Sequence, residues 1–210
     1  MGDFEVLTIY LTRHGETEWN VENRIQGSKD SELTTNGIRD AKLLSKKLSD
    51  INFRKIYTSS SKRAVTTANI LKNNSFIPII EEDALKEINF GDWEGKTKIE
   101  INERFENEFE SLWTSPHLYD HIPHRAESLN DLRERVGHVI QNIVSSNQEG
   151  NILIVTHAVV LATIIADLNQ SPIEKLWDIP YVHGTSLTII HFDDNKNLEF
   201  KILCDTSHLD

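Results

Sequence analysis

The N-terminal part of the chain contains an apolar run, Val6 to Leu11, that ends just before the polar triplet Arg13-His14-Gly15. The run is rich in β-branched and aromatic residues, which predicts a buried strand. In open α/β sheets, ligands bind outside the carboxyl ends of the strands. Arginine grips an oxyanion with a planar fork of donors, histidine can act as a nucleophile, and glycine lets the backbone approach a ligand closely. The triplet is therefore a candidate site whose chemistry depends on what other strands bring to the same edge.

Strand-like and helix-like segments alternate along the rest of the chain. Helical patterns occur at 34–49, 62–71, 98–113, 129–144 and 159–168, and short extended segments at 55–58, 77–80 and 151–155. Pro78 suggests an edge position for its segment, and 187–192 with 198–203 predict a closing hairpin. The alternation predicts an α/β fold: a three-layer sandwich with a mainly parallel sheet, an antiparallel edge and helices on both faces. In 34–49, the stripe expected to face inward is Ile38, Ala41, Leu44 and Leu48.

Length and charge limit the class of protein. With 210 residues we expect a single domain, 1–210, with a lid-like insertion around 96–127. The net charge of −11 argues against nucleic-acid binding, so an anion site must be a local positive pocket. No apolar run approaches the roughly 20 residues of a membrane span. The acidic N-terminus lacks a signal-peptide pattern, Val6 replaces the Ser or Thr that myristoylation of Gly2 requires, and a single cysteine, Cys204, fits a reducing cytoplasm.

Polar side chains follow three of the predicted strands. Arg13 and His14 follow the first, Arg63 lies on the first helical turn after the second, and His157 follows the third. Parallel strands end along one edge of a sheet, so these four side chains are expected to converge. Two arginines and two histidines in one place suit a dianion, and phosphate is the candidate that their charge and geometry favour.

The order and spacing of these residues resemble the histidine phosphatase superfamily, also called phosphoglycerate-mutase-like, over nearly the whole chain. The matching segments are Arg13 to Asn20, Gln26-Gly27, Asp30 to Gly37, Tyr57 to Ala68, Leu85 to Gly95, Glu127-Ser128 and Val155 to His157.

The resemblance implies a role for each matching position. His14 corresponds to the nucleophile that forms a phosphohistidine, and Glu87 to the general acid that protonates the leaving alcohol and then activates water. Arg13, Arg63 and His157 correspond to the pocket for the phosphoryl oxygens. The residues expected on the substrate and phosphate side are Thr17, Asn20, Gln26, Gly27 and Ala158. Positive charge around the equatorial oxygens is what phosphoryl transfer needs, so no metal or other cofactor is expected.

The superfamily contains phosphatases and phosphoglycerate mutases, and we interpret this chain as a phosphatase acting on a small phosphorylated metabolite. A mutase needs extra basic groups for a second acidic group of its substrate, whereas Ile88-Asn89 follows Glu87 where the mutases carry an Arg-Tyr type of pair. The 98–113 helix is acidic and is expected to repel a carboxylate-rich ligand. The alternatives are a phosphoglycerate mutase, which is an isomerase, and a non-catalytic phosphate-binding module; the substrate and the oligomeric state stay open.

Two features depart from the family pattern, and a third stands outside it. Arg125-Ala126 replaces the usual Gly-Gly before Glu127, and Ala158 replaces the glycine that often follows the second histidine. Three histidines, His117, His121 and His124, lie in a proline-bracketed segment. The segment has no complete ligand pattern for a metal, so we expect a loop that covers the mouth of the pocket.

Overall fold

The computed structural model describes residues 7–72, 75–193 and 197–210, so Gly2, Val6 and the tip of the closing hairpin lie outside the described residues. A six-stranded sheet has the order β3-β2-β4-β1-β5-β6. Its strands are β1 (Leu7–Arg13), β2 (Phe53–Ser59), β3 (Ile79–Glu82), β4 (Gly150–Thr156), β5 (Leu187–Phe192) and β6 (Leu198–Asp205). Strands β3, β2, β4 and β1 run parallel, and β5 and β6 are antiparallel to their neighbours. The predicted mixed sheet, with its antiparallel end and its edge strand after Pro78, is confirmed.

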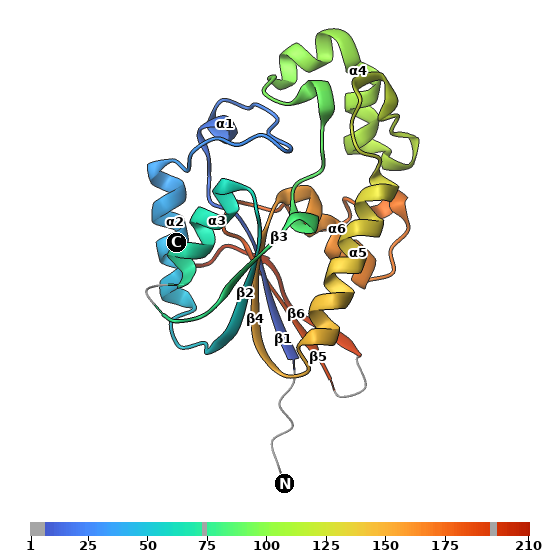
Figure 1. Cartoon of the computed structure of the whole chain (residues 1–210). Helices are drawn as coiled ribbons and strands as arrows, with labels where there is room; N and C mark the ends of the chain where they lie inside the picture. The colour runs from blue at the N-terminus through green and yellow to red at the C-terminus, as the bar shows by residue number, and fades with distance from the viewer. Residues whose placement is uncertain (1–6, 73–74, 194–196) are drawn as a thin grey trace.

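Helices pack against both faces of the sheet: α2 (Thr35–Lys47) and α3 (Lys62–Lys72) on one, α5 (Leu129–Ser146) and α6 (Ala158–Leu168) on the other (Figure 1). Helices α1 (Glu18–Val21) and α4 (Lys98–Thr114) lie beyond one edge of the sheet. Short 3-10 turns are η1 (Asp83–Leu85), η2 (Gly91–Trp93), η3 (Pro116–Leu118), η4 (Ile122–His124) and η5 (Ile173–Lys175). Among the described residues, no helix combines the length and the apolar character that crossing a membrane requires.

Alternating side chains of the central strand β4 belong to two separate cores. Ile152 and Ile154 face the core that contains α5 and α6, whereas Leu153 and Val155 face the core that contains α2 and α3. Because successive side chains of a strand point to opposite faces, an unbroken apolar run is what a sheet covered on both sides requires. The three-layer arrangement therefore follows from the strand sequence itself.

Helix α2 packs with a narrower apolar face than its pattern predicts. Ala41, Leu44 and Leu48 are buried, but Ile38 is 36% exposed, and Gly37 and Ser45 are buried instead. The expectation that Ile38 faces the core is therefore wrong. Gly37 lies there because the backbone of Glu16 passes so close that a Cβ atom would meet the Glu16 carbonyl oxygen at 2.1 Å. This close contact holds the loop after β1 against the start of α2.

The carboxyl ends of β1, β2 and β4 meet at one edge of the sheet. Register pairs Arg13 with Thr156 and Thr58 with Val155, so the three strands finish side by side. In Figure 1, helices α1 and α4 lie at the top of the view, beyond this edge. The fold therefore leaves the residues that follow these strands beneath α1 and α4.

Candidate active site

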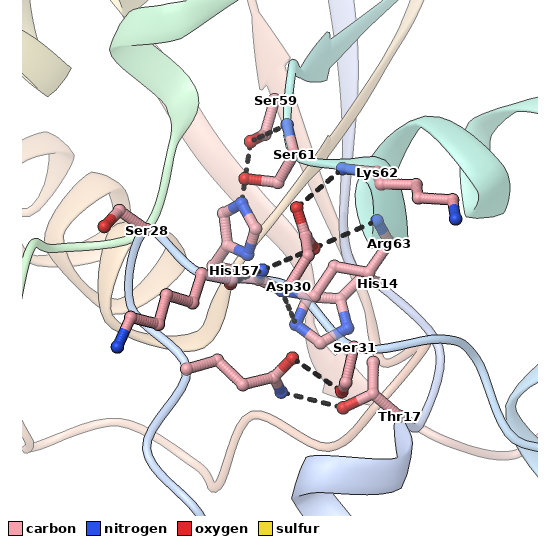
Figure 2. Close-up of polar contacts among 12 residues, drawn as sticks. His14, Thr17, Ser28, Asp30, Ser31, Ser59, Ser61, Lys62, Arg63 and His157 are labelled. Atoms are coloured by element: carbon pink, nitrogen blue, oxygen red, sulfur yellow. Dashed lines mark hydrogen bonds and ion pairs between the residues drawn. The ribbon is translucent and has the colours of Figure 1, made fainter. Parts of the chain in front are cut away.

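The structure brings together the three strand ends that carry His14, Arg63 and His157. The rings of His14 and His157 lie 5.2 Å apart between centroids, and Arg63 Nε donates to His14 Nε2 at 3.2 Å. Figure 2 shows this cluster with the side chains that support it. His14 and Arg63 are buried at 3% and 2% exposure, so the cluster is a protected site and not a charged surface loop.

The ring of His14 is held in one tautomer. Its Nδ1 lies 2.7 Å from the Gly15 carbonyl oxygen, which can only accept, so Nδ1 carries the proton and Nε2 keeps a lone pair. Burial and then the charges of Arg63 and Arg13 hold the pKa of His14 well below its usual value. Because the neutral form is favoured, Nε2 is an available nucleophilic atom at neutral pH.

Arg63 is held by contacts that use most of its donors. Its Nη1 donates to the Lys29 carbonyl and to Asp30 Oδ1, both at 2.7 Å, and its Nη2 donates to the Gly27 carbonyl at 2.9 Å. Asp30 also accepts from the backbone N–H groups of Lys62 and Arg63. Asp30 therefore fixes both the side chain of Arg63 and the start of α3. Asp30 is not among the site residues predicted from the sequence, although the Asp30-Ser31 match to the family was a usable signal.

Two buried side-chain nitrogens in this cluster have no partner among the described residues: Arg13 Nε, which is a donor, and His157 Nδ1, which is a donor when it carries the ring proton. The other end of each side chain is anchored, because Arg13 Nη1 donates to the Val182 carbonyl at 2.9 Å and His157 Nε2 lies 2.7 Å from Ser59 Oγ. Burial and then the Arg63 charge hold the pKa of His157 well below its usual value. A buried donor without a partner is costly, so an anion that accepts from both groups would remove this cost.

Glu87 lies at the N-terminus of α6 and is partly buried. Its carboxylate accepts from the backbone N–H of Ile88 at 3.1 Å, of Val159 at 3.2 Å and of Val160 at 3.3 Å. Burial raises the pKa of Glu87, opposed by the Val159 N–H and by the positive charge of Arg63. A carboxyl group with a raised pKa is suited to donate a proton near neutral pH.

Two side chains hold the segment that contains Glu87 from behind. Arg135 forms a bidentate ion pair with Glu127, at 2.6 and 2.9 Å, and donates to the carbonyls of Ala84 and Glu87.

Arg125, at one of the positions where the family usually has glycine, adopts a left-handed conformation with φ of 58°. Glycine takes this conformation without strain, so the backbone shape is retained here by a less favourable residue.

The other predicted substrate-side residues divide into two groups. Asn20 and Ala158 line a cavity of about 690 Å³ together with Arg13. Thr17 and Gln26 lie behind it, because Thr17 donates from its N–H and Oγ1 to Asn20 Oδ1, and Gln26 Nε2 donates to Thr17 Oγ1 at 2.7 Å. Gly27 also lies behind the site, where its carbonyl holds Arg63.

The cavity has walls from α1, from α4, from the N-terminal part of α6 and from the segment 177–184. Its α4 wall consists of Lys98, Phe109 and Trp113, and none of the glutamates of that helix is among the described lining residues. The expectation that α4 presents a repelling acidic face to the ligand is therefore wrong, because the helix turns its glutamates away from the cavity.

The histidine segment does not cover the mouth of the cavity, and this expectation is also wrong. His124 is fully buried and stacks on Trp93, with ring centroids 3.7 Å apart and planes at 4°, while its Nε2 lies 2.7 Å from the Tyr119 hydroxyl. Burial lowers the pKa of His124 to about 4. The described residues contain no group of three or more His, Cys, Asp or Glu that could hold a metal ion. His124 therefore packs in an aromatic cluster with Trp93, Phe105 and Tyr119, whereas His117 is exposed.

Comparison with known proteins places this geometry in a family. The model of the histidine phosphatase superfamily (branch 1) matches residues 9–204. Phosphoserine phosphatase 1 of Hydrogenobacter thermophilus is 28% identical, covering 94% of this chain and 92% of its own. A 2,3-bisphosphoglycerate-dependent phosphoglycerate mutase of Cytophaga hutchinsonii is 32% identical and covers 84% of each chain. The solved structure of Bacillus stearothermophilus YhfR is 44% identical, with a TM-score of 0.93 over 97% of this chain and 100% of that one. The chain belongs to the histidine phosphatase superfamily, as its motifs predicted.

Proposed function

We propose that this protein hydrolyses phosphate monoesters in two steps through a phosphohistidine. His14 Nε2 attacks phosphorus, the bond to the ester oxygen breaks, and Glu87 gives its proton to the leaving alcohol. Water then attacks the phosphohistidine, Glu87 takes a proton from that water, the bond from phosphorus to His14 Nε2 breaks, and inorganic phosphate leaves. The unprotonated Nε2 of His14, which accepts from Arg63 Nε in this structure, and the raised pKa of Glu87 support these roles.

The observation that carries the proposal is the pair of buried, unpartnered donors beside His14, within the described residues. We propose that Arg13 Nε, His157 Nδ1 and the Arg63 guanidinium hold the phosphoryl oxygens as charge spreads over them in the transition state. Asn20 and the backbone N–H of Ala158 complete the lining, and Thr17, Gln26 and Gly27 position Asn20 and Arg63. In this scheme the arginines supply the positive charge, and no metal ion takes part.

We further propose one domain over 1–210 with a lid-like insertion around 96–127, of which α4, and not the histidine segment, forms a wall of the cavity. The substrate is a small phosphorylated metabolite, as the names of phosphatase relatives suggest, and the net charge of −11 disfavours nucleic acid. A single cysteine that is buried fits a cytoplasmic protein.

The mutase alternative is supported by the Cytophaga relative but not by the cavity wall. A mutase must hold a second acidic group, but Arg24 in the cavity wall is already bound to Glu22 at 2.6 Å and to the Gly95 carbonyl at 2.8 Å. Beyond Arg13, this leaves Lys98, exposed at the start of α4, as the lysine or arginine of the lining that could take such a group. We therefore favour hydrolysis, with water and not a sugar phosphate as the acceptor.

Release of inorganic phosphate from p-nitrophenyl phosphate should continue unchanged in excess EDTA, because charge in the site comes from side chains. The same protein should show no interconversion of phosphoglycerates. Rapid quenching during turnover should trap phosphate on one histidine, which a non-catalytic binding module cannot do. Loss of turnover in EDTA with recovery on adding a divalent ion would refute the scheme.

A further inference from the structure

Aromatic side chains lie on several walls of the cavity next to the proposed catalytic cluster. Trp19, Phe109, Trp113, Trp177 and Tyr181 line it, and they come from α1, α4 and the segment 177–184. The cavity of about 690 Å³ is of the size that holds a small organic ligand and is far larger than a phosphoryl group needs. The space beyond Arg13 is therefore shaped for the alcohol half of the ester.

Two of these rings form a continuous surface that bridges separate elements. The centroids of Trp113 and Trp177 lie 5.0 Å apart with planes at 38°. Trp177 Nε1 donates to the Leu112 carbonyl at 2.7 Å, so its only polar atom is used inside the protein. Trp113 is still 37% exposed, although a large ring of this kind gains from being covered. The pair therefore presents apolar ring surface to whatever enters the cavity.

The charged residues of the cavity wall are mostly bound to other protein groups. Glu16 accepts from the Thr34 hydroxyl at 2.6 Å, and Arg24 is held by Glu22 and the Gly95 carbonyl. Lys98 is exposed at the first residue of α4. The amino acid part of a substrate such as phosphoserine would place its ammonium and carboxylate groups against the aromatic rings of the cavity, where few free groups of opposite charge are available.

We propose, on the basis of the phosphatase function above, that the alcohol half of the substrate is a large, planar, apolar group that packs against Trp113 and Trp177. Stacking on aromatic side chains tolerates many ring systems, so shape and apolar area select the ester. Small polar esters bind only through the phosphoryl group. The enzyme therefore discriminates by the size of the apolar alcohol.

The test compares esters that leave as similar alkoxides, so that differences report binding of the alcohol. The substrates are naphthylethyl phosphate, ethyl phosphate and phosphoserine, with p-nitrophenyl phosphate as the check on basal activity. We expect kcat/KM for naphthylethyl phosphate to exceed that for the other two alkyl esters by about 10-fold or more. Trp113→Ala should remove most of this advantage, and Trp113→Phe should retain part of it. Phe76→Ala, which removes an exposed ring outside the cavity lining, is the matched control.

The outcomes separate this inference from the proposed function. Equal or better hydrolysis of ethyl phosphate or phosphoserine, with normal turnover of p-nitrophenyl phosphate, would overturn the inference alone. Failure to hydrolyse all four esters would overturn the phosphatase function and the inference with it. If Trp113→Ala does not fold, the substrate comparison on the unaltered protein still decides.

A separate observation concerns Ser59, the last residue of β2. Its hydroxyl is fully buried, accepts from the Ser61 N–H at 3.2 Å and lies 2.7 Å from His157 Nε2 (Figure 2). If His157 Nε2 carried the proton, the Ser59 hydroxyl would accept twice and its own proton would have no acceptor among the described contacts. The Ser59 hydroxyl is fully satisfied only when it donates to Nε2, so that Nδ1 carries the proton and is the one group left for a ligand to accept from.

We infer that Ser59 is a positioning residue that holds His157 in the Nδ1–H tautomer, with its donor free for a phosphoryl oxygen. Nitrogen-15 NMR of histidine-labelled protein should show this tautomer at His157, identified by its loss in His157→Gln. Ser59→Ala should mix the tautomers and lower kcat by about 10-fold or more, with a smaller change in KM. Ser60→Ala, at the neighbouring hydroxyl that binds Asp83, should do neither.

An Nε2–H tautomer in the unaltered protein would overturn this assignment, whatever the variants do. An unchanged tautomer in folded Ser59→Ala would also overturn it, because the hydroxyl would then not set the proton position.

Discussion

Replacement of His14 by alanine should remove phosphate release, with kcat/KM falling on the order of 10⁴-fold or more. No described neighbour supplies an equivalent atom: His157, the other histidine of the cluster, has its Nε2 engaged by Ser59. The variant should also fail to become labelled when turnover of a radioactive ester is quenched rapidly. Phosphate release and labelling, measured on the same preparation, check the result.

The control for this prediction is His138→Ala, which removes an exposed histidine on α5. His14 is buried at 3% exposure, so its removal leaves a small void and should cost some stability. Urea unfolding of both variants separates that loss from the loss of chemistry. Near-normal turnover in folded His14→Ala would remove the nucleophile assignment.

Strands and helices were predictable because their signals are local. The apolar runs of β1 and β4 specify strands covered on both faces, and the parallel order then places Arg13, His14 and His157 at one edge. The same logic placed Arg63, one helical turn into α3. For these residues, their positions in the sequence were enough to predict that they lie close together in the structure.

Contacts between distant side chains were not predictable in the same way. The Asp30-Ser31 match to the family indicates that Asp30 lies near the site, but nothing local shows that it binds Arg63, and nothing near Ser59 shows that it faces His157 98 positions away. His124 has the polar type expected of a loop, yet the ring of Trp93 gives it a place in a core. Such pairings depend on how elements pack, which a periodic pattern does not encode.

The residues that line the cavity show that the same limit applies to predicting the substrate from the sequence. Five acidic residues suggested that α4 repels an anionic ligand, but orientation decides which face of a helix meets the ligand. The segment 177–184, which has no strong pattern of its own, supplies Trp177 and Tyr181. The phosphatase chemistry could therefore be predicted from the motifs, whereas the proposal about the alcohol group depends on the three-dimensional structure.

The Glu87→Gln variant should lose far more activity toward alkyl phosphates than toward aryl phosphates. An alkoxide leaves poorly without a proton, and an amide cannot supply one, so kcat/KM for ethyl phosphate should fall about 10²-fold or more. A nitrophenolate leaves readily unprotonated, so p-nitrophenyl phosphate should lose less at the first step. The second step also uses Glu87, as a base toward water, so labelled enzyme should accumulate. The measurement is the ratio of alkyl to aryl kcat/KM, together with the amount of phosphoenzyme.

The raised pKa of Glu87 gives this prediction a pH dependence with a definite sign. Burial raises the pKa, so the proton donor is present at low pH and is lost as the pH rises through the raised value. Alkyl ester hydrolysis should therefore decline on the alkaline side of the pH profile, and this decline should disappear in Glu87→Gln.

The matched control is Glu103→Gln, which makes the same chemical change at an exposed position of α4. An equal fall for both esters would show that Glu87 is not the donor; Glu94 and Glu127 are poor substitutes, since Ser28 and Arg135 already hold their carboxylates.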